Sequence, residues 1–164
     1  MTGGQQADDD ALPEQLAAII EDFGALTERD RLQLLLDFSR ELPALPERLA
    51  GQRDRMEPVA ECQSPLFLLV EVEESPGAGD RVELYFDAPA EAPTTRGFAG
   101  ILREGLAGLT PAQVLAVPDD VPHRLGLSAA VSPLRLNGMA GMLFRIKRQV
   151  RQKSARAGAG SAAR

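Results

Sequence analysis

The stretch PVAECQSPLFLLVEVEESPGAGDRVELYF, residues 58–86, decides the fold class, because its apolar residues follow strand spacing rather than helical spacing. In its last third, Val82, Leu84 and Phe86 alternate with more polar residues, as a strand with one solvent-facing side requires. The cluster SPGAGD (75–80) is typical of a turn. We predict an antiparallel meander of about three strands, with Cys62 at its first bend.

Helical spacing flanks this meander on both sides. Before it, apolar residues recur at steps of three and four over 12–23 and again from Thr27, which can cap a second helix, to Leu42. After it, the same analysis predicts helical segments over 98–106, 111–115, 121–125 and 132–150. The expected fold is therefore α+β, with a small antiparallel sheet packed against N- and C-terminal helices.

The length of 164 residues fits one domain with a substantial core. Residues 1–10 (MTGGQQADDD) are polar and charged, which predicts a disordered leader. Residues 153–164 (KSARAGAGSAAR) have low complexity, which predicts a disordered basic tail. The folded domain is expected to span residues 11–152.

The charge is distributed unevenly along the chain. Seven of the 18 basic residues lie after residue 144, where no acid occurs, so the first 144 residues combine 11 basic with 24 acidic residues. The resulting net charge of −13 on this part repels nucleic acid and anionic membrane surfaces. We expect a basic protein partner, and neither a nucleic-acid nor a membrane partner.

The N-terminus and the cysteine count indicate the compartment. The first ten residues lack the basic and apolar regions of a secretory signal, and no apolar stretch approaches the roughly 20 residues that span a bilayer. We expect a cytoplasmic protein. With one Cys and one His, a single chain can form neither an internal disulfide nor a zinc or iron–sulfur site, so no metal is expected on this chain.

Cys62 is the candidate reactive residue. A lone cysteine is more often a small buried hydrophobe than a nucleophile, but Cys62 lies in a polar segment with Gln63 and Ser64 between two strand-like runs. His123 is the only histidine that could act as its base, and its position at a short helix start favours a surface or capping role. The segment 77–80 lacks the lysine and the following helix that phosphate binding needs.

Four segments resemble the SufE family in order and spacing, within a resemblance that runs over about residues 12–150. They are RELPALPERL (40–49), VAECQSPLF (59–67), TTRGFAGIL (94–102) and LGLSAAVSPLRLNGMAGMLFRIK (125–147). The most specific parts are the CQS motif at Cys62, Gln63 and Ser64 and the block that ends in RIK.

The resemblance implies an α+β fold shared with IscU-type iron–sulfur scaffold proteins. It also implies a sulfur acceptor that stimulates a SufS-type cysteine desulfurase and passes the sulfur to a downstream iron–sulfur scaffold. The acceptor cysteine of the family falls on Cys62, and the arginine of its RG motif falls on Arg96, for which docking or the sulfur environment is the implied role, as for Gln63 and Ser64. No cofactor is implied on this chain, because the pyridoxal phosphate belongs to the desulfurase.

Two departures from the family pattern surround the thiol. Glu61 stands where the family usually has Gly, and a neighbouring carboxylate disfavours the thiolate. Pro65 and the Leu-Phe pair after it replace the family's usual residues, and the proline removes a backbone donor. A persulfide is easily lost to other thiols, so we expect resting Cys62 to lie toward apolar neighbours such as Leu66 and to swing out on docking.

Two other functional classes are considered beside the sulfur carrier. An adapter would activate a desulfurase or scaffold without carrying sulfur, and it would keep this activity after Cys62→Ser. A scaffold that builds a cluster is disfavoured, because one Cys and one His do not supply the usual ligands.

Overall fold

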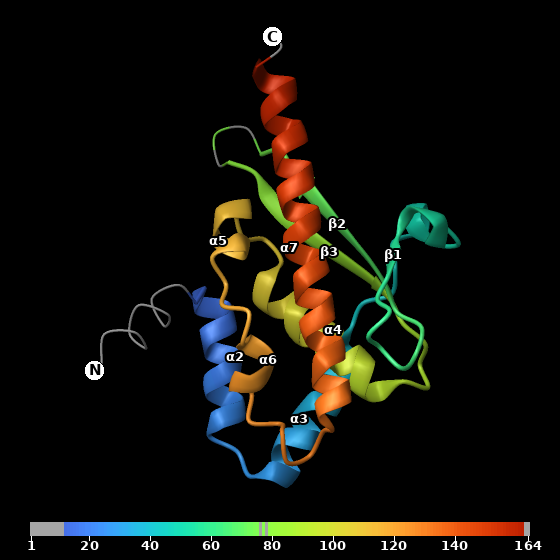
Figure 1. Cartoon of the computed structure of the whole chain (residues 1–164), viewed down its shortest axis with the longest axis vertical. Coiled ribbons are helices and arrows are strands. Elements are labelled where there is room, and N and C mark those ends of the chain that lie inside the picture. Colours follow the sequence, from blue (N-terminus) through green and yellow to red (C-terminus); the bar gives the residue numbers. More distant parts are fainter. Residues whose placement is uncertain (1–11, 76, 78, 163–164) are drawn as a thin grey trace, which may run out of the picture.

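The computed structural model describes residues 12–75, 77 and 79–162, and over these it has the mixed helical and antiparallel architecture that the sequence predicts (Figure 1). The elements in chain order are α2 (Glu14–Gly24), α3 (Glu28–Glu41), the 3-10 turns η1 (Glu47–Leu49) and η2 (Arg53–Arg55), β1 (Glu57–Pro58), β2 (Phe67–Glu73), β3 (Arg81–Asp87), α4 (Pro93–Leu106), α5 (Pro111–Leu115), α6 (Val121–Arg124) and α7 (Pro133–Ala162). The α+β class and the three antiparallel strands are confirmed.

The sheet has the order β1-β2-β3, and β1 pairs with only the first two residues of β2. Beyond β1, the edge of β2 is covered by side chains of α7. Gln149 Oε1 accepts a hydrogen bond of 2.8 Å from the backbone amide of Val70, and Lys153 donates from Nζ to the carbonyl of the same residue. These bonds satisfy backbone groups that an uncovered edge strand would leave open.

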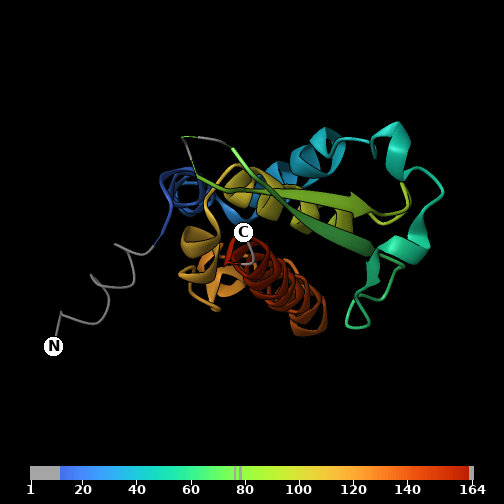
Figure 2. The ribbon, with the colours of Figure 1, turned by 90° about the horizontal axis from the view of Figure 1, so that it is seen from above.

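The main core lies between the sheet and the helices. Val82, Leu84 and Phe86 are buried in it, which confirms the alternation predicted for β3. The opposite face of the sheet is covered in part by a smaller apolar cluster that includes Leu49 and Met56 from the η1 and η2 region. The long helix α7 runs along the core side of β2, as Figures 1 and 2 show.

Helices α3 and α4 pack closely because α4 presents glycines to α3. A Cβ atom added at Gly97 would lie 2.6 Å from the carbonyl oxygen of Leu35, and one added at Gly100 would lie 2.6 Å from that of Phe38. Neither backbone oxygen can move without displacing the helix, so both positions require glycine. This contact fixes the position of α4, whose first turn contributes to the site described below.

Helix α7 continues to Ala162, where the sequence predicts a disordered tail from residue 153. The low complexity of this segment does not indicate the extension. The segment can continue the helix because Ala, Arg and Lys are strong helix formers and an established helix adds residues without a new nucleation step. The predicted leader at 1–10 and residues 163–164 lie outside the described residues. Among the described helices, none combines the length and the apolar character that crossing a bilayer demands.

Candidate functional site

Cys62 lies in the bend between β1 and β2, as predicted. The bend is closed at its base by the amide of Val59, which donates to the carbonyl of Leu66 at 3.0 Å. Within it, the amide of Cys62 donates to the carbonyl of Val59 at 3.2 Å. The cysteine side chain is half-buried and packs against the main core, to which Leu66 belongs, so the resting thiol lies toward apolar neighbours as expected.

Two glycines of α7 let this bend lie directly on the helix. Cys62 Sγ is 3.9 Å from the carbonyl oxygen of Gly138, and a Cβ atom added at Gly138 would lie 3.2 Å from Sγ. A Cβ atom added at Gly141 would lie 2.7 Å from Oε2 of Glu61. The two residues are three positions apart and share one face of the helix, so this face forms the seat of the cysteine bend.

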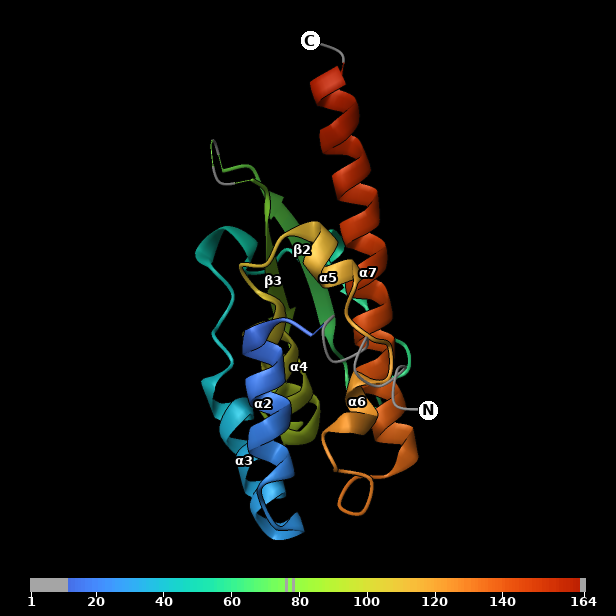
Figure 3. The ribbon, with the colours of Figure 1, turned by 90° about the vertical axis from the view of Figure 1, so that its left-hand side faces the viewer.

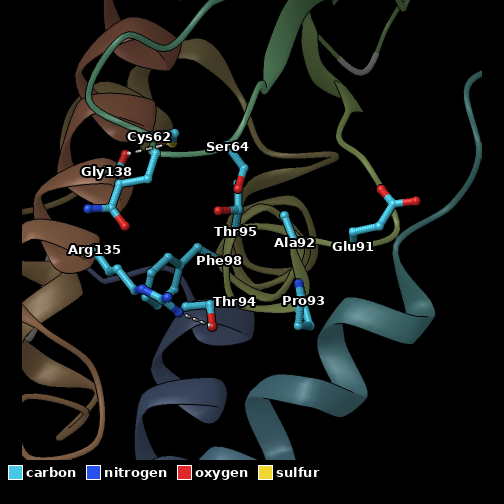
Figure 4. Close-up of a pocket in the computed structure, with 11 residues that line it drawn as sticks. Cys62, Ser64, Glu91, Ala92, Pro93, Thr94, Thr95, Phe98, Arg135 and Gly138 are labelled. Carbon is cyan, nitrogen blue, oxygen red and sulfur yellow. Dashed lines mark hydrogen bonds between the residues drawn. The ribbon is translucent and has the colours of Figure 1, made fainter.

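A pocket of about 110 Å³ opens beside Cys62 (Figure 4). Three segments line it: the bend, the start of α4 and the first turns of α7. From α7, Arg135 Nη1 donates to Thr94 Oγ1 at 3.1 Å and so joins two of the three segments. No side chain caps the start of α4. The start of α4 therefore places a positive helix-dipole end at the pocket that Cys62 also lines.

The thiol is neutral in this environment. Burial, followed by the charge of Glu61, raises the pKa of Cys62 to about 11, and the Arg145 cation opposes this rise only in part. The pKa of Glu61 is lowered, first by a hydrogen bond from its own backbone amide and then by Arg145. Glu61 is thus ionised, and its negative charge disfavours the Cys62 thiolate, as the sequence predicts.

Alternating charges bind the bend and β1 to α7. Arg145 Nη1 donates to Glu61 Oε2 at 2.6 Å, and Arg145 Nε lies 3.4 Å from Glu57 Oε2. Glu57 also accepts hydrogen bonds from Arg148 and, at 3.0 Å, from Gln149 Nε2. The side chain of Arg145 is only 14% exposed, so this network is screened less by solvent than a surface pair.

The structure separates the predicted site residues into two groups. Gln63 and Ser64 line the pocket together with Cys62. Arg96 does not line the pocket. Its Nη1 donates a hydrogen bond to the carbonyl of Ala88 at 2.9 Å, and its Nη2 donates one to the carbonyl of Leu42 at 3.5 Å. Its guanidinium thereby ties α4 to the ends of β3 and α3. His123 lies in α6 and is also absent from the lining of the pocket.

Sequence reasoning missed Arg135, Thr94 and Arg145. Arg135 and Arg145 belong to the block 125–147 that carried the resemblance, and Thr94 begins the segment that contains the RG motif. The segments were recognised, but nothing in them indicated contact with the bend. In the part of the chain that the structure describes, no three His, Cys, Asp or Glu side chains gather closely enough to hold a metal ion.

Comparison with known proteins agrees with these features. The sequence profile of the SufE family, described as an Fe-S metabolism associated domain, matches residues 17–150. An uncharacterized SufE-like protein of Mycobacterium tuberculosis is 54% identical over 142 residues, covering 87% of this chain and 95% of that protein. SufE-like protein 1, chloroplastic/mitochondrial, of Arabidopsis thaliana is 25% identical over 133 residues, covering 80% of this chain and 33% of that protein.

A solved structure shares the fold. The solution structure of a hypothetical protein from Thermus thermophilus matches with a TM-score of 0.75 and 38% sequence identity, covering 88% of this chain and 98% of that chain. The profile match covers most of the chain, and the α+β architecture is common to both proteins. The chain therefore belongs to the SufE family, whose domain is associated with iron–sulfur metabolism.

Proposed function

We propose that this protein carries sulfur for iron–sulfur cluster assembly, accepting it on Cys62 from the persulfide of a SufS-type cysteine desulfurase and stimulating that enzyme. The observation that carries the proposal is the placement of the single thiol at a bend, half-buried, beside a pocket that reaches α4 and α7. Cytoplasmic localisation and delivery to a downstream iron–sulfur scaffold are parts of the same proposal.

The transfer is a displacement at sulfur. The Cys62 thiolate attacks the outer sulfur of the donor persulfide, a new S–S bond forms on Cys62, and the S–S bond of the donor breaks. The electron pair of the broken bond leaves with the donor cysteine as a thiolate, which can take up the proton that Cys62 releases. No external oxidant or reductant is consumed, because the sulfane sulfur only changes its partner.

The raised pKa makes the partner necessary. With a pKa of about 11, on the order of one thiol in 10⁴ is ionised at neutral pH, which is far below the few per cent of an ordinary cysteine. Moving the bend off its buried seat removes burial, the larger cause of the rise, while Glu61, the neighbour of Cys62 in the same bend, moves with it. Docking to the desulfurase would therefore activate the thiol, which is protected when the partner is absent.

The pocket suits the product of the transfer. Its volume of about 110 Å³ exceeds the roughly 30 Å³ share of one water molecule, so the added sulfur atom fits. A persulfide is more acidic than a thiol and is held as an anion near the hydroxyls of Ser64 and Thr95 and the positive end of α4. Arg135 adds a cation at the rim of the same pocket.

Mass spectrometry of the Cys62 peptide tests the proposal. After incubation with a SufS-type desulfurase and L-cysteine, followed by alkylation, the peptide should gain about 32 Da, and reduction should remove this mass. Cys62→Ser serves as the control and should also lose stimulation of the desulfurase. A variant that still stimulates fully would indicate the adapter instead, and the absence of any added sulfur would overturn the carrier.

A further inference from the structure

Two large apolar side chains of α7 are exposed to solvent. Phe144 is 62% exposed and Leu134 is 54% exposed, and the third such side chain, Leu32, is 39% exposed on α3. Single exposed leucines are common in soluble proteins, but an exposed phenylalanine on a helix that otherwise supplies the core is less expected. These two exposed side chains make the outer face of α7 a candidate surface for contact with another molecule.

The exposed residues of α7 lie on either side of the seat of the cysteine bend. Phe144 follows Gly141 by three residues and Gly138 by six, which places it about 9 Å along the helix axis from Gly138. Leu134 precedes Gly138 by one turn, or about 6 Å. Since Gly138 contacts Cys62 at 3.9 Å, both apolar side chains lie within two helical turns of the point where the cysteine bend meets α7.

The charge of this helix differs from that of the rest of the chain. Residues 133–152 contain no acid, whereas the first 144 residues have a net charge of −13. Arg135 and Arg151 are exposed, and Arg148, although bonded to Glu57, is 40% exposed. Arg148 and Arg151 follow Phe144 by four and seven residues and so lie on its side of α7, whereas Arg135 precedes it by nine residues and lies on the other side. Exposed aromatic and arginine side chains together supply much of the binding energy of many protein interfaces.

Direct sulfur transfer requires that the donor protein cover Cys62. A specific interface buries about 800 Å² on each partner, which corresponds to a disc about 16 Å in radius. Along the axis of α7, Leu134 and Phe144 both lie within this radius of Gly138, which contacts Cys62. The same disc includes the first turns of α7, which carry Arg135. The surface of the donor protein that covers Cys62 therefore meets both apolar and positive groups.

From this geometry we infer that the outer face of α7 is the docking surface for the sulfur donor, with Phe144 as its apolar anchor. The inference rests on the proposed function and names the surface that the desulfurase recognises. The complementary patch on the desulfurase would be an apolar depression flanked by carboxylates, which would pair with Arg148 and Arg151 on the same side of α7 as Phe144. The expectation of a basic partner, drawn from the charge of the whole body, does not apply to this face.

The test compares Phe144→Ser with Leu32→Ser, a matched control at an exposed apolar position of α3, which Figure 3 shows on the opposite side of the molecule from α7. Both variants remove an exposed side chain, so both should keep the circular dichroism spectrum and thermal midpoint of the wild type. Phe144→Ser should weaken the Kd for a SufS-type desulfurase by at least about 10-fold. Leu32→Ser should leave it within about twofold.

A second pair of measurements separates docking from chemistry. Phe144→Ser should slow sulfur transfer at limiting concentrations but leave the alkylation rate of Cys62 by iodoacetamide unchanged, because the anchor does not contact the thiol. Arg151→Glu should slow association with the desulfurase, and added salt should reduce the difference from the wild type.

The outcomes distinguish this inference from the function on which it rests. If wild-type Cys62 gains no sulfur from the desulfurase, the proposed function fails and the docking surface fails with it. If wild type and Phe144→Ser gain sulfur and bind equally well, only the docking surface is overturned. The inference also fails if sedimentation shows that Phe144 supports self-association while desulfurase binding is unaffected by its replacement.

Discussion

The carboxylate of Glu61 and the guanidinium of Arg145 form an ion pair at 2.6 Å, which ties the residue before the thiol to α7. The pair holds the cysteine bend on its glycine seat, because Glu61 also lies against Gly141. Any movement that carries Cys62 out toward a partner must break this contact. The same carboxylate raises the pKa of the thiol, so one residue both retains the bend and suppresses its reactivity.

Glu61→Gln should make the thiol more reactive. The substitution removes the negative charge that raises the pKa of Cys62 and leaves the Arg145 cation, which lowers it. Burial remains the larger cause, so the pKa should fall only part of the way toward its ordinary value. The pH profile of iodoacetamide alkylation, followed by mass spectrometry, measures the change, and an unchanged profile would mean that burial alone sets the pKa.

The wild-type thiol should titrate only at high pH. Alkylation of the folded protein should rise through a midpoint near pH 11, and in urea the midpoint should return to the value of about 8.5 of a free cysteine. Below about pH 8.5, thiol reactivity should be on the order of 300-fold lower in the folded protein, and the difference should shrink as the pH rises toward 11. A folded midpoint near 8.5 would contradict the assigned environment.

The same pKa predicts a pH dependence of stability. Because the folded-state pKa exceeds the unfolded one, the folded state holds more protons in this range, and the contribution of the thiol to stability is complete below about pH 8.5 and is lost as the pH rises toward 11. The free energy of unfolding of the wild type should therefore fall relative to that of Cys62→Ser across this range. Urea titrations of both proteins at several pH values measure the difference, and a constant difference would contradict the prediction.

Gly100→Ala should destabilise the fold. The added methyl group would lie 2.6 Å from the backbone oxygen of Phe38, so α3 and α4 must separate, at a cost of about 1–3 kcal/mol. Gly24→Ala is the matched control, because its added methyl group would meet nothing within 4 Å, and it should be neutral or slightly stabilising. Thermal unfolding of both variants tests the contrast, and equal midpoints would refute the close contact.

Arg96→Lys should lower stability without changing the thiol. A lysine cannot reproduce the two hydrogen bonds that the guanidinium donates to Ala88 and Leu42, so a loss of about 1–3 kcal/mol is expected. The alkylation profile of Cys62 should stay as in the wild type. A shifted profile would instead support the sulfur-environment role that the family resemblance implies for this arginine.

Local patterns in the sequence were sufficient for the order of the main helices and strands and for the position of the thiol. Two features depend only on neighbours along the chain and were therefore predictable from the sequence. They are the alternation of Val82, Leu84 and Phe86 and the cap at Thr27. The bend at Cys62 followed from the polar residues between two strand-like runs. The extension of α7 was not predicted, because low complexity does not distinguish a disordered tail from a helix that continues one already formed.

Tertiary structure alone decided which residues surround the thiol. Arg145 lies 84 residues from Glu61 in the sequence, and Gly138 lies 76 residues from Cys62, so no local pattern relates them. Arg96 carried a recognisable motif, yet its guanidinium binds backbone carbonyls outside the pocket. Periodicity along the chain shows which face of a segment is buried, but the partner of that face, and hence the charge and burial that set a pKa, depends on how distant segments pack.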